Sequence, residues 1–232
     1  MSPNPGVSLT VLRALPIFEM LDDECLRPLT RVAALRHIPR HTVVLKAGDR
    51  TDNIYFVLSG ALKVQVSDEE GREVILSMLG PGELFGEMGV LDDHPRSATV
   101  LAVESSDVVV MGKEDFKHCL VENPDVSLFI MRSLTKRLRL ADRNIESLAL
   151  LDVYGRVARL LLESAETIDG RKVVTHKITK QDIAKMIGAS REMVSRVMRD
   201  LTAQGLIQEH EGQLILVDLA AFRRHGDLDA VN

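Results

Sequence analysis

The stretch "ITKQDIAKMIGASREMVSRVMRDLTAQGLI", residues 178–207, contains two short amphipathic segments with a glycine between them. Thr179 with Asp182 three residues later is a capping signature for a first helix, and Gly188 stands where a helix ends in a left-handed residue. Ser190 is then placed to cap a second helix. The residues expected to be buried are Ile183, Met186 and Ile187 in the first helix and Val194, Val197 and Leu201 in the second. The pattern predicts a helix-turn-helix; the alternative is an ordinary αα-hairpin with no role in DNA binding.

The exposed side of the second helix carries Arg191, Glu192, Arg196 and Arg199. Arg191 and Arg196 can each donate two hydrogen bonds to guanine O6 and N7, and Glu192 can accept one from cytosine N4. These charges gather toward the N-terminal end of the helix, where recognition helices meet base edges. An ordinary solvent-exposed helix face has no reason to concentrate its charged residues at one end. The pattern therefore favours a helix that reads DNA.

The segments before and after the predicted helix-turn-helix add a further helix and two strands to it. "LLDVYGRVARLLLESA", residues 150–165, predicts a helix, which is followed by a polar loop. "LIQEHEGQLILVD", residues 206–218, predicts two strands around a Glu-Gly turn. The C-terminal third therefore predicts a winged helix-turn-helix.

The middle of the chain has a different apolar period. The apolar positions recur three or four residues apart and are Met131, Leu134, Leu138, Ala141, Ile145 and Leu148. The charged residues that flank them are Lys136, Arg137, Arg139, Asp142 and Arg143. An apolar stripe this narrow is typical of a helix that pairs with a second copy of itself. The alternative is that the stripe packs on the chain's own β-domain; we expect a parallel homodimer helix, with Phe129 and Ile130 packed on the sheet.

The first half of the chain has the period of β-strands. In "ALKVQV", residues 61–66, Leu62, Val64 and Val66 are expected to point inward and Lys63 and Gln65 outward. "DEEGR" supplies a turn, and "EVILSML", residues 73–79, completes a hairpin. Further short apolar runs separated by turn residues predict a β-sandwich or roll.

Between two of these strands lies "GELFGEMGVLDDHPRSAT", residues 82–99. Dense glycines let backbone N–H groups approach a ligand closely. A single arginine, Arg96, stands beside Ser97, which is a guanidinium fork and a hydroxyl suited to an anion. The structural alternative is a pair of turns with an exposed salt bridge.

Composition narrows the class of protein. The chain has 232 residues, is 45% hydrophobic and carries a formal net charge of −5. Residues 171–201 alone carry a net charge of +5, and such a basic island on an acidic body indicates a local nucleic-acid contact. The two cysteines, Cys25 and Cys119, lack metal-type spacing, and the chain shows neither a signal peptide nor a membrane-spanning run, so we expect a cytoplasmic protein with no membrane partner. There is no P-loop, zinc-protease helix or nucleophile elbow, so we expect no enzyme.

Taken in order, these motifs resemble the catabolite activator protein/fumarate–nitrate regulator (CRP/FNR) superfamily of bacterial transcription regulators. The resemblance rests on "GEMGVLDDHPRSA", on "SLALLDVYGRVA" after the long helix and on "ITKQDIAKMIGASREMVSR", and it covers nearly the whole chain. It implies an α+β fold with a cyclic-nucleotide-binding β-roll at residues 1–125, a dimerisation helix at 126–151 and a winged helix-turn-helix at 152–232.

The resemblance also assigns roles to individual residues. Gly86 and Met88 would offer backbone to a cyclic nucleotide, Glu87 would accept from the ribose 2′-hydroxyl, and Arg96 with Ser97 would bind the cyclic phosphate. Arg191, Glu192 and Arg196 would read bases. The residues that would hold DNA phosphates are Thr179, Lys180, Gln181 and Ser190. The partners implied are double-stranded promoter DNA with a pseudo-palindromic site, a second copy of the chain, and RNA polymerase.

One pair of positions departs from the pattern of the cyclic-AMP receptors. Where those proteins place two adjacent hydroxyl residues against the purine, this chain has Ala141 and Asp142. A carboxylate only accepts hydrogen bonds, which suits the two adjacent donors of guanine, but Asp142 can equally pair with Arg139 or with a partner's Arg143. Cyclic AMP is the favoured effector, with cyclic GMP, cyclic di-GMP or no effector as alternatives.

The sequence also bears on other cofactors and on one other class of protein. No cysteine cluster for iron–sulfur ligation and no haem ligand is identifiable, and His94 is expected to be a loop residue, so neither these groups nor a metal is expected. A nucleotide-binding module that regulates an enzyme or a channel would share the β-roll but would lack the basic reading helix.

Overall fold

The computed structural model describes residues 6–174, 178–210, 213–219 and 222, and it divides the chain into two compact units. The units are Met1–Lys136 and Arg137–Asn232, so the division falls inside the long helix α5 (Pro124–Leu150). Each unit has a hydrophobic core of its own. The functional boundaries at residues 125 and 151 stay a prediction.

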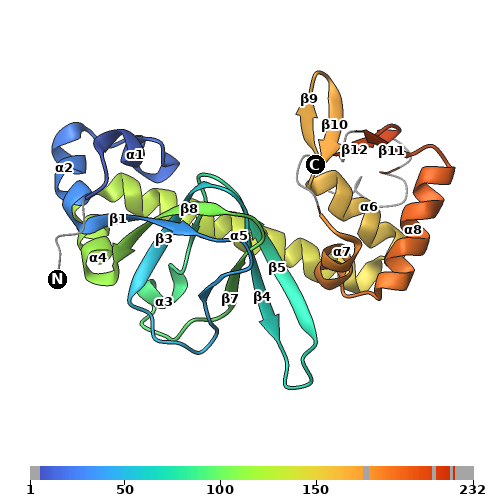
Figure 1. Ribbon diagram of the computed structural model, residues 1–232, viewed down its shortest axis with the longest axis horizontal. Helices are drawn as coiled ribbons and strands as arrows, with labels where there is room; N and C mark the ends of the chain where they lie inside the picture. Colours follow the sequence, from blue (N-terminus) through green and yellow to red (C-terminus); the bar gives the residue numbers. More distant parts are fainter. Residues whose placement is uncertain (1–5, 175–177, 211–212, 220–221, 223–232) are drawn as a thin grey trace. The chain divides into compact units, whose positions relative to one another are not determined.

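The first unit contains two four-stranded antiparallel sheets (Figure 1). In spatial order, the first sheet consists of β1 (Ala33–Ile38), β8 (Ser106–Gly112), β3 (Asn53–Ser59) and β6 (Leu84–Phe85). The second consists of β2 (Val43–Leu45), β7 (Thr99–Ala102), β4 (Leu62–Ser67) and β5 (Glu73–Leu79). The β-roll that the short apolar runs predicted is confirmed.

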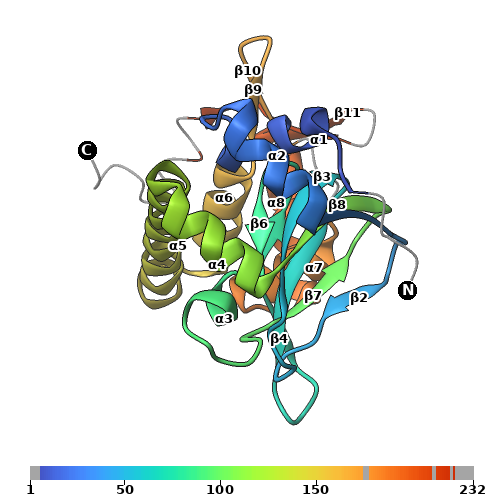
Figure 2. The same cartoon turned by 90° about the vertical axis from the view of Figure 1, so that its left-hand side faces the viewer.

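The first sheet is apolar on both faces because two different layers cover it. Along β8, Val108 and Val110 face the core between the two sheets, whereas Val109 and Met111 face a second core. That second core is built with helices, which gather on this face of the sheet (Figure 2). The helices are α1 (Leu9–Arg13), η1 (Pro16–Phe18), α2 (Asp23–Val32), α4 (Lys113–Glu122) and the beginning of α5. Residues 82–99, which we call the cassette, contain β6 and end at the first residue of β7, and both strands contribute buried residues to these cores.

One strand departs from the expected alternation. Gln65 on β4 was predicted to point outward, but it is only 8% exposed, and its side-chain amide donates to Glu73 Oε1 at 2.9 Å. The pairing of β4 with β5 shifts register between Val64 and Gln65. The pairing passes over Leu76, so the bulge lies on β5 and adds no residue to β4. Because Gln65 is buried, the prediction of an outward, exposed side chain was wrong.

Helix α5 confirms the predicted long helix and exposes most of its apolar stripe. Ile130 is buried in the first unit's core, and Phe129 and Leu134 pack against it. The remaining large apolar stripe residues are exposed in the single chain: Met131 by 56%, Leu138 by 62%, Ile145 by 65% and Leu148 by 55%. Exposed apolar side chains repeated along one stripe are typical of a surface that a partner covers.

The described residues of the second unit include the end of α5, three further helices and a small sheet. The helices are α6 (Val153–Glu163), α7 (Lys180–Ile187) and α8 (Arg191–Ala203). The sheet has the order β11 (Ile207–His210), β12 (Gln213–Leu216), β10 (Arg171–Val174) and β9 (Glu166–Ile168). The predicted wing strands pair as β11 and β12, while their Glu211–Gly212 turn lies outside the described residues.

The segment predicted as a polar loop contains a hairpin instead. Strands β9 and β10 pair around Asp169 and Gly170, both of which have positive φ. Consecutive positive-φ residues suit the tight turn of a hairpin, and Asp-Gly is a sequence signal for it. The loop prediction was therefore wrong, and β10 adds the wing hairpin to a larger sheet by pairing with β12.

Candidate functional site

The backbone of the cassette turns sharply at Gly86, between strand β6 and the short helix α3 (Met88–Leu91). Gly86 has a φ of +81°, and a Cβ at this position would lie 2.6 Å from Nη1 of Arg96. Only glycine combines that φ with the close approach of the guanidinium. The glycine predicted to offer backbone to a ligand therefore also makes room for the arginine.

Arg96 is buried, with 6% of its surface exposed. Its Nη1 donates to the carbonyl of Gly86 at 2.8 Å, and its Nη2 donates to the carbonyl of Asn53 at 2.7 Å. Its Cζ lies 6.0 Å from the ring centre of Tyr55. Within the described residues no carboxylate forms an ion pair with Arg96, and its buried Nε has no hydrogen-bond partner.

This environment is unusual for a cation. Burial lowers the pKa of Arg96 below the ordinary value of a guanidinium, because the charged form loses contact with water. Two neutral carbonyls compensate only part of that cost, since a buried charge is ordinarily paired with an opposite one. The arrangement favours an anion as the missing partner.

The other predicted cassette residues lie beside Arg96 along the chain or in space. Glu87 is buried, with 2% exposed, between Gly86 and Met88. Ser97 lies next to Arg96, and its hydroxyl is 3.8 Å from the sulfur of Met88. Met88 is 51% exposed, so its side chain borders the cassette on the solvent side. The structure thus brings together five of the seven predicted effector residues.

The remaining two, Ala141 and Asp142, lie on α5 in the second unit and are exposed. Arg139 was the same-helix partner considered for Asp142. Within the part of the chain that the structure describes, neither side chain has an ion-pair or hydrogen-bond partner. The carboxylate of Asp142 is therefore available, and its contact with an effector base stays a prediction.

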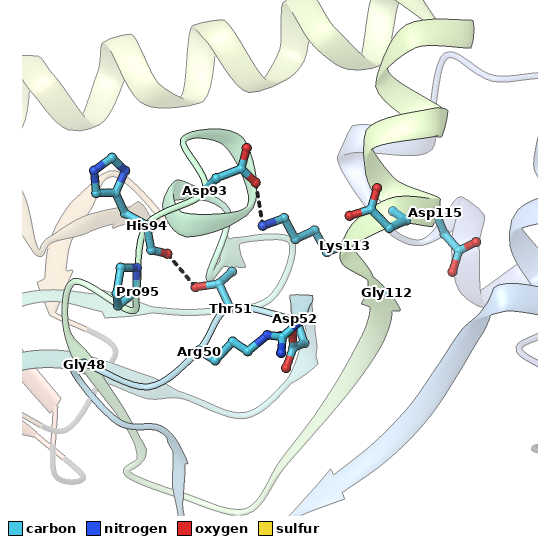
Figure 3. Close-up of a pocket in the computed structure, with 11 residues that line it drawn as sticks. Gly48, Arg50, Thr51, Asp52, Asp93, His94, Pro95, Gly112, Lys113 and Asp115 are labelled. Carbon is cyan, nitrogen blue, oxygen red and sulfur yellow. Dashed lines mark hydrogen bonds and ion pairs between the residues drawn. The ribbon is translucent and has the colours of Figure 1, made fainter.

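A separate open pocket of about 660 Å³ lies beside the cassette loop (Figure 3). Asp93 and His94 of that loop border it, together with Thr51 and Lys113, whereas Arg96 does not. Thr51 donates to the carbonyl of His94 at 3.0 Å, and Lys113 and Lys117 approach Asp93 at 2.6 and 2.7 Å. These lysines lower the pKa of Asp93 to about 2. Carboxylates also line this pocket, including Glu114 and Asp115, and would repel an anion, so the cassette around Arg96 is the better anion site.

The helix-turn-helix is built from the local signals that predicted it. The hydroxyl of Thr179 accepts from the N–H of Asp182 at 3.1 Å, and the hydroxyl of Ser190 accepts from the N–H of Met193 at 3.1 Å. Gly188 ends α7 with a φ of +64°. Both caps and the left-handed turn are confirmed, and they fix where α8 begins.

The predicted base-reading side chains are all exposed near the beginning of α8. Among the described residues, no hydrogen bond or ion pair engages the side chains of Arg191, Glu192 or Arg196. Arg199 differs, because its Nε donates back to the carbonyl of Ser195 at 3.3 Å. The four predicted phosphate contacts lie exposed at the beginnings of the two helices and are Thr179, Lys180, Gln181 and Ser190.

Two arginines of α6, the half-buried Arg156 and the buried Arg159, were missed by the sequence analysis. Arg156 donates to the carbonyl of Ile187 at 2.8 Å, and so holds the C-terminal end of α7. Arg159 is 6% exposed and reaches the carbonyl of Arg143 at 3.3 Å and Oε2 of Glu146 at 3.4 Å on α5. An arginine within the apolar run "VARLLL" was the available signal, but its partners are distant in sequence.

Comparisons with known proteins match two separate parts of the chain to two known domains. Residues 35–123 match the cyclic nucleotide-binding domain, and residues 155–225 match the Crp-like helix-turn-helix domain. A CRP-like cAMP-activated global transcriptional regulator of Mycobacterium tuberculosis is 31% identical over 211 residues, which cover 89% of this chain and 94% of that protein. The chain belongs to the CRP/FNR family of transcription regulators.

Two further members illustrate the range of this family. The cAMP-activated global transcriptional regulator CRP of Haemophilus influenzae is 34% identical over 190 residues, covering 79% of this chain and 83% of that protein. The structure described as the c-di-GMP responsive global regulator CLP of Xanthomonas campestris is 26% identical, with a TM-score of 0.69, and the match covers 85% of this chain and all of that one, 100%. These CRP/FNR proteins are transcription regulators and not enzymes.

The helix-turn-helix match decides against a nucleotide-binding module without a DNA-binding domain. As for membranes, none of the helices in the described residues is both long enough and apolar enough to cross a bilayer.

Proposed function

We propose that this chain acts as a homodimer that binds a pseudo-palindromic promoter site when a cyclic nucleotide occupies the cassette, with cyclic AMP as the first candidate. The named relatives in Mycobacterium tuberculosis and Haemophilus influenzae are cAMP-activated, which supports that choice of nucleotide. The dimer would act in the cytoplasm, where promoter DNA lies, and would contact RNA polymerase there.

The environment of Arg96 is the observation that carries the effector proposal. A guanidinium that is 6% exposed, with neutral carbonyls as its partners and an unpartnered Nε, fits the cyclic phosphate of a nucleotide. Charge-assisted hydrogen bonds from such a group are about twice as strong as neutral ones. Ser97 would add a hydroxyl donor beside Arg96.

The remaining cassette residues would recognise the sugar. Glu87 is buried beside Gly86, and a carboxylate accepts a hydrogen bond from a ribose 2′-hydroxyl. The backbones of Gly86 and Met88 flank it and would approach the nucleotide, since Gly86 carries no side chain. A deoxyribose nucleotide would leave Glu87 without that donor and would bind more weakly.

The exposed stripe on α5 supports the homodimer. A second copy that packs along Met131, Leu138, Ile145 and Leu148 would bury side chains that the single chain leaves more than half exposed. Two-fold symmetry would present two α8 helices to DNA, which is why the expected site is a pseudo-palindrome with half-sites about one helical turn apart.

On each half-site, the beginning of α8 would enter the major groove. Arg191 and Arg196 would read guanines and Glu192 a cytosine, because these side chains are exposed and engage no other group of the described chain. Contacts to phosphates would come from Thr179, Lys180, Gln181 and Ser190, which would position the dimer without specifying sequence.

A guanine nucleotide is the second candidate effector, and Asp142 favours it. Its carboxylate is exposed and unpaired within the described chain, and guanine offers it two adjacent donors where adenine offers one amino group. The family includes a c-di-GMP responsive regulator, CLP. Ala141 beside it has no hydrogen-bonding side chain, so Asp142 would carry the discrimination.

Calorimetric titration with cyclic AMP, cyclic GMP and cyclic di-GMP separates these candidates. Wild type should bind cyclic AMP most tightly, and Asp142→Thr should leave that order unchanged. A guanine preference that shifts toward adenine in Asp142→Thr, but not in the control Asp125→Thr at the other end of α5, would replace cyclic AMP with a guanine nucleotide. Heat from none of the three nucleotides would make the regulator independent of these effectors.

A further inference from the structure

Met193 is an exposed apolar side chain in the first turn of α8. It is 44% exposed, whereas the valine, methionine and leucine residues that follow it on this helix are buried. Those buried residues are Val194, Val197, Met198 and Leu201. Met193 therefore contributes little to the core of its own unit, and its side chain is left for another partner.

The position of Met193 on the helix is fixed by the cap. The backbone N–H of Met193 donates to the hydroxyl of Ser190 at 3.1 Å, which holds the first turn of α8. Met193 directly follows Glu192 and precedes Arg196 by three residues, so it borders the face that carries the exposed charges. Where the beginning of this helix enters a major groove, Met193 enters with it.

The chemistry of the groove limits what a thioether can contact there. Methionine donates no hydrogen bond and its sulfur accepts only weakly, so contact with a polar base edge would desolvate that edge without compensation. The C5-methyl group of thymine is the apolar group that base pairs present in the major groove, and apolar side chains contact it.

We propose that Met193 is a specificity-determining residue that contacts a thymine C5-methyl group in each half-site. The proposal rests on the proposed DNA binding by α8 and adds an apolar contact to the charged ones of Arg191, Glu192 and Arg196. The methyl group distinguishes thymine from cytosine and from both purines at that position. The preferred site should therefore hold a thymine close to the base pairs that Arg196 reads.

Deoxyuridine tests this contact because it differs from thymine only by the methyl group. The preferred duplex is first selected from a random library by the wild-type dimer, and each thymine is then replaced by deoxyuridine. Removing one methyl group from an apolar contact should weaken wild-type binding about fourfold per half-site, at one symmetry-related pair of positions. Changing both half-sites should weaken it about fifteenfold.

Protein variants show whether Met193 is the group that senses the methyl. Met193→Ala should lose the difference between thymine and deoxyuridine, and Met193→Leu, which keeps an apolar side chain of similar size, should retain it. Arg199→Ala on the same helix is the control and should keep the full wild-type difference. Circular dichroism checks that each variant folds.

The outcomes separate this proposal from the function on which it rests. If the wild type selects a sequence but tolerates deoxyuridine everywhere, or if Met193→Ala keeps the methyl preference, Met193 does not contact thymine. A wild-type chain that selects no sequence at all would overturn the proposed DNA reading and this inference together.

Discussion

Both units of this regulator have arginines at their predicted binding sites. The arginine in the first unit is buried, whereas those in the second are exposed. Arg96 in the cassette is 6% exposed, and two backbone carbonyls hold its guanidinium in place before any ligand arrives. Arg191 and Arg196 on α8 are exposed, and their side chains engage no other group within the described residues. The cassette arginine is buried and held in place by the backbone, whereas the arginines on α8 are exposed to solvent.

This difference has thermodynamic consequences. A buried cation gains much from one well-placed anion and is little affected by salt, because ions in solution cannot reach it. Exposed cations on DNA gain by releasing counterions, so their binding depends steeply on salt. Effector binding should therefore depend weakly on ionic strength, and DNA binding strongly.

The largest expected effect comes from breaking the proposed dimer. Leu138→Glu places a charge in the middle of the exposed stripe of α5, where Leu138 is 62% exposed in the single chain. The dimer should dissociate, and DNA affinity should fall toward the non-specific range, by about a thousandfold or more, while the cassette still binds its nucleotide. Analytical ultracentrifugation and gel shift measure this.

The control is Arg139→Glu, which alters charge on the neighbouring, off-stripe position of the same helix and should leave the dimer intact. A Leu138→Glu protein that remains dimeric would show that the two copies pair elsewhere.

The next largest effect is expected from removing the buried arginine of the cassette, Arg96. Arg96→Leu should weaken nucleotide binding by about 2–5 kcal/mol, because the ligand phosphate would face a buried site without a counter-charge. The fold should survive, since no described carboxylate forms a direct ion pair with Arg96 that the change would break. Arg50→Leu, the same change at a side chain that is 89% exposed, should bind normally. Calorimetry that finds full binding by Arg96→Leu would place the effector elsewhere.

A smaller effect is expected on the DNA face. Arg191→Ala or Arg196→Ala should cost about 1–3 kcal/mol and relax sequence preference at one base pair of each half-site. Arg199→Ala should not change the preference, because Arg199 folds back onto the carbonyl of Ser195. Selection from random duplexes measures both. An unchanged preference in Arg191→Ala would remove that residue from base reading.

The smallest effect is a change in salt dependence. Lys180→Ala should weaken binding to all sequences alike and lower the slope of log affinity against log salt by about one unit per protomer. Lys46→Ala, an exposed lysine of the first unit, should leave the slope unchanged. A Lys180→Ala protein with altered sequence preference would mean that Lys180 contacts a base.

Sequence predicted the features that depend on neighbours along the chain. The caps of Thr179 and Ser190 and the left-handed Gly188 are set by the residues within one helical turn, so local patterns sufficed. The Asp169–Gly170 hairpin was also locally encoded, but the strands beside it have only three and four residues.

What the sequence could not supply depends on distant contacts. The outward prediction for Gln65 failed because the neighbouring strand β5 supplies Glu73 as its hydrogen-bond partner, and alternation within β4 does not reveal such a contact. The carbonyls that Arg156 and Arg159 contact are distant from them in the sequence, so only the packed unit shows these contacts. The cassette arginine was predicted, but its neutral partners Gly86 and Asn53 were not.

The central claim is that nucleotide in the cassette controls DNA binding, and one measurement tests it most directly. Fluorescence anisotropy gives the affinity of the wild-type dimer for its selected duplex with and without saturating cyclic AMP, and calorimetry gives the affinity for cyclic AMP with and without that duplex. Because coupling between two sites is reciprocal, both affinities should rise by the same factor, on the order of 5- to 150-fold. Equal DNA affinity with and without cyclic AMP, cyclic GMP and cyclic di-GMP would contradict the account.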